Sequence, residues 1–238
     1  SPLAKFAVQL FAVALILWPL QVLPAESLAG HWLLLLPAVI LWVNIWNFMD
    51  GSHGLIAMQA LLIALAVCLL PGQTPALRLA ALALAGACLG FLPFNLPEAR
   101  LFLGDVGSHA LAAAVIGLLL ASVHYRTLSL PEALMLSSVL LVDALSTLVR
   151  RLFAGKKLWR AHREHLYQFA VRRGFAPWRV CVAYGALTVV AILFVFGCRQ
   201  AGAGDVLAAG VAGWGMLLAV GHALVRRRLL DRHRAERA

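Results

Sequence analysis

The sequence predicts an all-α fold, a polytopic transmembrane helical bundle, and three observations support this prediction. The chain of 238 residues is 63% hydrophobic and only 13% charged, whereas a soluble domain carries about 25% charged residues. Its apolar residues form long runs rich in Leu and Ala, as expected of membrane helices of about 20 residues. No segment shows the period-two alternation that is typical of a transmembrane barrel strand.

About eight apolar segments approach or reach the length that crosses a bilayer. They lie at residues 6–24, 31–47, 55–70, 76–93, 107–123, 132–149, 179–198 and 204–225. Proline falls at or near several predicted ends, where it is readily tolerated. Because no internal repeat or low-complexity linker is visible, residues 1–238 are predicted to form a single transmembrane domain.

Basic residues set the predicted orientation. If the N-terminus is cytoplasmic, all but three of the 20 Lys and Arg residues fall on the inner side, the exceptions being Arg78, Arg126 and Arg199. Cytoplasmic loops carry such an excess, so both termini are predicted to be cytoplasmic, together with a basic loop at 150–178 and a tail at 226–238. The net charge of +10 then reflects topology and contact with anionic lipid, and no nucleic-acid partner is expected.

The first polar cluster comprises Asn44, Asn47 and Asp50, at the inner end of the second predicted span. A spacing of three residues brings these side chains to one side of a continuing helix, and Gly51 and Gly54 then allow the chain to bend. Two amides and a carboxylate at membrane depth are costly unless they meet partners or line a wet cavity. Simple interhelical hydrogen bonding is the alternative.

The second polar cluster comprises Asn95 and Asp105, between the fourth and fifth predicted spans. Asn95 is predicted to begin a short loop, and Asp105, flanked by Gly104 and Gly107, lies where the fifth span starts. Glycine on both sides allows a phosphate or a metal to approach the backbone closely. The alternative is that Asp105 only caps its helix.

The third polar cluster contains His162 and His165, which are expected to share a helix face because they are three residues apart. With Arg163 and Lys156 nearby, the binding of a phosphate or diphosphate is favoured. Two histidines without a third ligand make a zinc site a weak prediction, and a solvated loop is the alternative. The alternation of spans places all three clusters on the cytoplasmic side.

Together and in this order, three segments resemble a known family. NxxNFMDG at 44–51, FLGDVGS at 102–108 and AHREHLYQ at 161–168 are similar to the cytoplasmic signatures of the polyprenyl-phosphate N-acetylhexosamine-1-phosphate transferases, the MraY/WecA-like glycosyltransferase family 4. Asp143 also resembles a family position near the inner end of a span. The resemblance implies an enzyme of the bacterial inner membrane that serves envelope polysaccharide synthesis.

The reaction that the resemblance implies is the attack of a polyprenyl phosphate on the β-phosphorus of a UDP-N-acetyl amino sugar, which gives UMP and a polyprenyl-diphosphate sugar. The implied metal is Mg²⁺, with Mn²⁺ as a substitute, and its implied ligands are Asp105 and Asp50. The residues implied to be catalytic are Asp50, Asp105, His162 and His165. Those implied to bind substrate are Asn44, Asn47, Asn95, Arg163 and Lys5.

Two features depart from the family pattern. Family members carry a DDxxxL motif just before a segment like SPLAKFAVQL, whereas this sequence begins at Ser1, so we expect it to be the C-terminal two-thirds of a family member. His53 stands where the family reads DGxDG, and the loss of that carboxylate would weaken magnesium binding or shift the metal preference.

These departures keep a second function class open. The alternative to the transferase is a catalytically inactive fragment or homologue that acts as a membrane binding or assembly subunit. A transporter is disfavoured because no inverted repeat is visible. The sugar, the polyprenyl length and the existence of a homodimer are left open.

Overall fold

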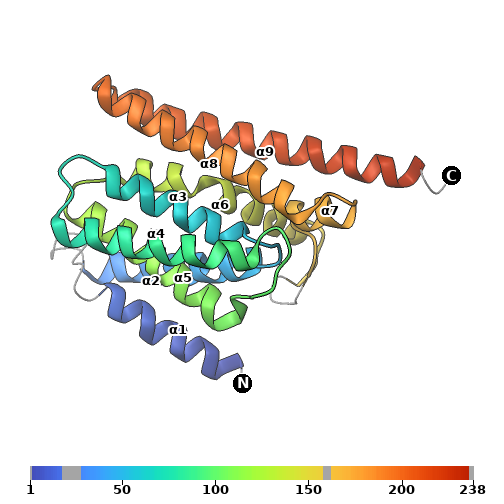
Figure 1. Cartoon of the computed structure of the whole chain (residues 1–238), viewed down its shortest axis with the longest axis horizontal. Coiled ribbons are helices and arrows are strands. Elements are labelled where there is room, and N and C mark those ends of the chain that lie inside the picture. Colours follow the sequence, from blue (N-terminus) through green and yellow to red (C-terminus); the bar gives the residue numbers. More distant parts are fainter. Residues whose placement is uncertain (1, 18–27, 158–161, 236–238) are drawn as a thin grey trace.

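The computed structural model describes residues 2–17, 28–157 and 162–235 (Figure 1). Over these ranges all regular structure is helical, which confirms the predicted all-α fold. The helices that the structure describes are α1 (Pro2–Leu17), α2 (Leu28–Met49), α3 (Leu55–Leu69), α4 (Pro75–Asn95), α5 (Gly104–His124), α6 (Leu130–Phe153), α7 (Leu166–Arg172), α8 (Pro177–Gln200) and α9 (Gly204–Ala235).

The helices also fit a multi-pass membrane protein. Five of those described, α4, α5, α6, α8 and α9, are long and apolar enough to cross a membrane. Three shorter apolar stretches, Ala7–Ile16, Leu35–Met49 and Leu55–Leu69, lie in α1, α2 and α3. The number of spans and the sides of the termini stay predictions.

The predicted polar loop at 150–178 contains more helix than expected. α6 continues to Phe153, because Arg150 and Arg151 in its last turn are favourably placed beside the helix carboxyl end. The short α7 follows, and Pro177 at the first turn of α8 starts the next long helix. Only short irregular stretches of this loop therefore remain within the described residues.

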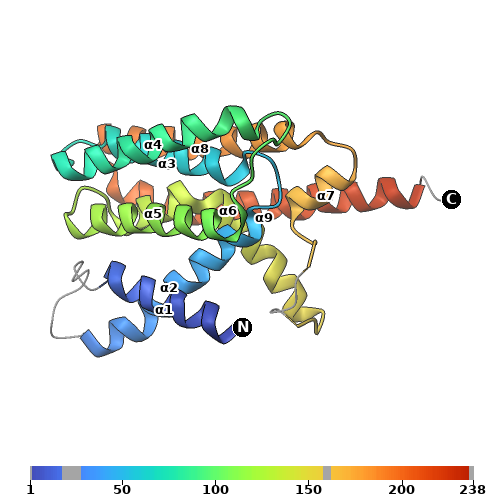
Figure 2. The ribbon, with the colours of Figure 1, turned by 60° about the horizontal axis from the view of Figure 1, so that its bottom comes forward.

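α3 forms the centre of the bundle and packs against α4, α5 and α8. Its apolar residues point in all directions and are mostly buried, as expected of a helix surrounded by others. Ala57, Ala60 and Ala64 are fully buried, and such small residues let neighbouring helices approach closely. Figure 2 shows that the carboxyl end of α6 diverges from the other helices.

The connections between helices divide between the two ends of the bundle (Figure 1). The turns from α3 to α4, from α5 to α6 and from α8 to α9 lie at one end. The turns from α2 to α3 and from α4 to α5, with the described residues between α6 and α8, lie at the other, which we call the site end. All three polar clusters of the sequence are at the site end.

A polar anchor holds the opposite end together. Ser129 and Glu132 form a capping box at the start of α6, which satisfies backbone donors that the helix leaves unpaired. Arg199, at the end of α8, donates to both carboxylate oxygens of Glu132 and, at 2.7 Å, to the carbonyl of Thr127. This anchor joins α6 to α8.

Candidate functional site

A polar cavity of about 330 Å³ opens at the site end, where α2 meets α3 and α4 meets α5. It brings members of the first two polar clusters together, although these clusters are about 50 residues apart in the sequence. Its lining residues are Asn47, Asp50, Gly51, Ser52, His53, Asn95, Phe102, Leu103, Gly104 and Asp105. Four of the predicted site residues, Asn47, Asp50, Asn95 and Asp105, thus share one cavity wall.

The two asparagines of the cavity hydrogen-bond to the elements that form its wall. Asn47 donates from Nδ2 to the Ser108 hydroxyl at 2.8 Å, which joins the end of α2 to the start of α5. Asn95 is the last residue of α4 rather than the first of a loop; its Oδ1 accepts from the Gly54 amide and its Nδ2 donates to the Leu101 carbonyl at 2.6 Å. Asn47 therefore makes an interhelical hydrogen bond of the kind that the sequence left as the alternative for the first cluster. Both asparagines also line the cavity.

Two carboxylates dominate the electrostatics of the cavity. Asp50 follows directly after α2, and Asp105 lies in the first turn of α5. Burial, together with the nearby negative charge of Asp105, raises the pKa of Asp50 to about 7. Since two like charges held close together disfavour each other, a bound cation would stabilise both as carboxylates.

A divalent metal is compatible with these two residues. No group of three or more His, Cys, Asp and Glu residues with metal-binding geometry occurs in the part of the chain that the structure describes. Magnesium, however, commonly takes one or two carboxylates and completes its shell with water and substrate phosphates. Asp50 and Asp105 are the residues that could hold it in this cavity.

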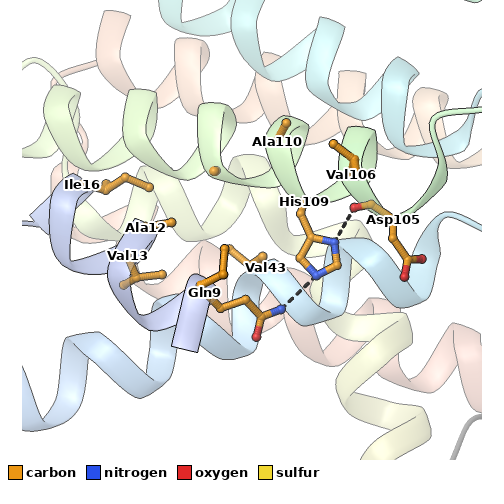
Figure 3. Close-up of a pocket in the computed structure, with 11 residues that line it drawn as sticks. Gln9, Ala12, Val13, Ile16, Val43, Asp105, Val106, His109 and Ala110 are labelled. Carbon is orange, nitrogen blue, oxygen red and sulfur yellow. Dashed lines mark hydrogen bonds between the residues drawn. The ribbon is translucent and has the colours of Figure 1, made fainter. Parts of the chain in front are cut away.

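Asn44 lies outside the polar cavity and belongs to a separate network with Gln9 and His109. Figure 3 shows Gln9, His109 and Asp105 of this network. Gln9 of α1 donates to Asn44 Oδ1 at 3.2 Å and lies 2.9 Å from His109 Nε2. His109 Nδ1 is 2.5 Å from the carbonyl of Asp105; because a carbonyl can only accept, this nitrogen carries the proton and Nε2 accepts from Gln9. No spacing in the sequence indicated Gln9, which stands singly in an apolar run, or His109, although His109 directly follows the segment FLGDVGS at 102–108.

An apolar groove of about 500 Å³ adjoins this network between α1 and α5 (Figure 3). Asp105 borders both the groove and the polar cavity. The rest of the groove is almost entirely hydrocarbon, lined by Val8, Gln9, Ala12, Val13, Ile16, Val43, Val106, His109, Ala110 and Ala113. A polar cavity and an apolar groove thus meet at one residue, Asp105.

The third polar cluster lies behind the end of α2 and does not line the cavity. The rings of His162 and His165 are 4.9 Å apart and lie 6.3 and 6.5 Å from the ring of Phe48. His165 is only 1% exposed, and burial lowers its pKa to about 4, so its ring is neutral. Burial and the charge of Arg151 also lower the pKa of His162.

The prediction that His162 and His165 share one face of a helix is wrong, because residues 162–165 are not helical. The backbone here bonds to other elements instead. The Glu164 carbonyl accepts from Arg226 at 2.9 Å and from Arg150 at 3.3 Å. Arg163 is exposed, and its own carbonyl accepts from Arg172. The Lys5 side chain lies outside the described residues.

Tyr167 connects this cluster to the cavity. Its hydroxyl donates to the Phe48 carbonyl at 2.9 Å and accepts from Gln168 at 3.1 Å. A β-carbon at Gly51, which lines the cavity, would overlap that hydroxyl. Only glycine lets the turn and the tyrosine meet this closely.

This contact gives a stability prediction. Gly51→Ala is expected to displace Tyr167 and to lower the free energy of unfolding by about 1 kcal/mol, as inserted methyl groups do in tight sites, measured by thermal unfolding in detergent. Gly86→Ala in α4 is the matched control, since a β-carbon there meets nothing within 4 Å. Equal stability of both variants would contradict the contact.

Comparison with known proteins adds an independent observation. Residues 1–123 match glycosyl transferase family 4. The chain is 30% identical to a decaprenyl-phosphate N-acetylglucosaminephosphotransferase of Mycobacterium tuberculosis, in a match that covers 88% of the chain and 63% of the relative. It is 36% identical to a phospho-N-acetylmuramoyl-pentapeptide-transferase of Trichormus variabilis, over 63% of the chain and 44% of that protein.

The chain thus spans less than two thirds of the length of these curated relatives. The family match covers just over half of the chain and includes both cavity carboxylates, Asp50 and Asp105. This chain belongs to glycosyl transferase family 4.

Proposed function

We propose that the protein transfers an N-acetylhexosamine 1-phosphate from a UDP-sugar to a polyprenyl phosphate in the bacterial inner membrane. The observation that carries the proposal is the meeting of a polar cavity and an apolar groove at Asp105. A nucleotide diphosphate requires a polar, cation-holding cavity, and an isoprenoid chain requires hydrocarbon. The names of the relatives specify a polyprenyl or amino-sugar substrate of this kind.

In the proposed reaction a phosphate oxygen of the acceptor forms a bond to the β-phosphorus of the UDP-sugar. The bond from that phosphorus to the bridging oxygen breaks, UMP leaves, and the lipid keeps a diphosphate sugar. A bound Mg²⁺ would neutralise charge on the diphosphate oxygens.

The residues of the cavity have separate proposed roles. Asp50 and Asp105 would hold the metal. The side-chain amides of Asn47 and Asn95 would shape the pocket for the nucleotide sugar. His162 and His165 are proposed to support catalysis indirectly, from behind Phe48. The role is indirect because His165 is buried and neither histidine lines the cavity. Arg163 is exposed and would attract the anionic donor.

Asn44 and Lys5 remain proposed substrate-binding residues. Asn44 would act at the apolar side, next to Gln9 and His109. The role of Lys5 rests on the family resemblance alone.

The proposal is tested with the protein in nanodiscs, supplied with Mg²⁺, a polyprenyl phosphate and UDP-N-acetylglucosamine or UDP-N-acetylmuramoyl-pentapeptide. We expect equal amounts of UMP and polyprenyl-diphosphate sugar from one of these donors. Donor binding by calorimetry without any UMP would instead support a binding or assembly subunit.

The pKa of Asp50 gives a pH prediction for the metal-free protein. Below about pH 7 its carboxyl is protonated, so a cation must displace that proton, whereas above pH 7 the carboxylate is already formed. The affinity for Mn²⁺ is therefore expected to rise by up to about tenfold per pH unit toward pH 7 and then to level off. Electron paramagnetic resonance titrations between pH 5.5 and 8 measure this, and an affinity that stays flat would contradict it.

A further inference from the structure

Asp143 is a buried carboxylate that the proposed reaction does not use. It lies in α6 and is 4% exposed. Its Oδ1 accepts from the Leu166 amide at 2.9 Å, and its Oδ2 accepts from the Tyr167 amide at 3.4 Å. The hydroxyl of Tyr184 donates to Oδ2 at 2.6 Å, and His222 Nε2 lies 3.2 Å from Oδ1. One side chain of α6 therefore joins α8, α9 and the start of α7.

Two of these partners are backbone amides with no other acceptor within their helix. Leu166 and Tyr167 are the first residues of α7, and the first amides of a helix lack intrahelical partners. A buried amide without a partner is costly. The Asp143 carboxylate thus fixes the backbone immediately after His165.

The stretch 162–167, which we call the histidine segment, is held at two further points. Near its centre Glu164 accepts from Arg151 at 2.5 Å through Oε1, and its carbonyl accepts from Arg226 at 2.9 Å. At its end the Tyr167 hydroxyl reaches the Phe48 carbonyl, one residue from Asn47 of the cavity. Between these points, Asp143 accepts from the Leu166 and Tyr167 amides, and Gln168 Oε1 of α7 accepts from the His165 amide at 3.2 Å.

We propose that Asp143 is the positioning residue of the histidine segment, which its carboxylate holds at Leu166 and Tyr167 against the end of α2. This inference rests on the proposed function, in which the histidine segment supports catalysis beside the cavity. A displacement of about 1 Å in such a supporting element can cost about 10²-fold in rate. The competing role is purely structural, the packing of α6 on α8 and α9 through Tyr184 and His222.

Two variants separate these roles in the protein reconstituted in nanodiscs. Asp143→Asn keeps the size of the side chain but leaves only one acceptor oxygen for the two amides. Leu166→Pro removes the amide itself; the position suits proline, because it is the first residue of α7 and the preceding His165 is extended, with φ −63° and ψ 151°. Tyr184→Phe is the matched control, since it removes a bond to the same carboxylate without touching either amide.

We expect Asp143→Asn to speed hydrogen exchange at the Tyr167 amide about tenfold, as for one lost hydrogen bond, with exchange in α3 unchanged. We expect kcat to fall by about 10²-fold, with a smaller change in the KM of the UDP-sugar. Leu166→Pro should also lower kcat, and the double variant should lose less than the product of the two losses, because both substitutions weaken the same contact between the Asp143 side chain and the start of α7. Tyr184→Phe should keep wild-type exchange at Tyr167 and wild-type kcat.

Exchange that rises equally in all helices, or losses in kcat that multiply in the double variant, would overturn the positioning role in favour of general packing. Faster exchange at Tyr167 with unchanged kcat would overturn it as well. If the wild-type protein makes no product, the proposed function fails, whereas the exchange experiment still decides whether Asp143 holds the histidine segment.

Discussion

Replacing Asp105 by asparagine is expected to lower kcat by at least about 10³-fold while leaving membrane insertion and the melting temperature unchanged. Asparagine has the same shape, but it removes the charge that would hold a metal beside the diphosphate, and the loss of such electrostatic stabilisation typically costs about 10²–10³-fold for a single neutral donor. Asp105 also borders both the polar cavity and the apolar groove. Release of UMP from the UDP-sugar measures the effect.

The chain offers a closely matched control for this substitution. Gly204-Asp205-Val206 at the start of α9 repeats the local sequence of Gly104-Asp105-Val106 at the start of α5, but it lies at the opposite end of the bundle. Asp205→Asn is expected to leave turnover unchanged. If Asp105 only caps its helix, both substitutions should lower stability alike and neither should change turnover.

Replacing Arg199 by methionine is expected to lower the free energy of unfolding by about 2 kcal/mol. The Glu132 carboxylate, 5% exposed, would lose its charged partner, and breaking a fully buried ion pair costs about 3–5 kcal/mol. The smaller value is expected because the Arg199 side chain is 26% exposed and Ser129 still donates to the carboxylate. Unfolding in mixed micelles measures the loss.

Two further variants identify the cause of that loss. Arg199→Lys keeps the charge but loses the fork that reaches both carboxylate oxygens, so a smaller loss is expected. Combining Arg199→Met with Glu132→Gln should recover much of the stability, because no buried charge is then unpaired. A loss below about 0.5 kcal/mol in Arg199→Met, the range of ordinary surface changes, would show that the pair does not hold α6 to α8.

The common location of the polar clusters could be predicted from the sequence because it depends only on the number of spans between them. An even number of crossings returns the chain to the same end, whatever the error in each boundary. The three clusters therefore lie at the same end of the bundle, although the predicted segments differ from the helices by several residues. That Asn47, Asp50, Asn95 and Asp105 line one cavity while the histidines do not is decided by packing.

The contacts of single side chains could not be predicted in this way. Tyr167 bonds to Phe48, 119 residues earlier, and Asn44 bonds to Gln9 in another helix; such pairings are decided by packing. The histidine spacing suggested a helix, but residues 162–165 are not helical, and the Glu164 carbonyl accepts from the distant Arg226. A carboxylate within the apolar run of α6 was a usable signal for Asp143, since an ionisable residue at membrane depth needs partners.

The most direct test of the central claim, that Asp50 and Asp105 hold a cation against a nucleotide diphosphate, is pulsed electron paramagnetic resonance of bound Mn²⁺ in the presence of UDP-N-acetylglucosamine. We expect phosphorus hyperfine couplings from the diphosphate in the wild-type protein and their loss in both Asp50→Asn and Asp105→Asn. Unchanged couplings in both variants would contradict the claim and place the cation elsewhere.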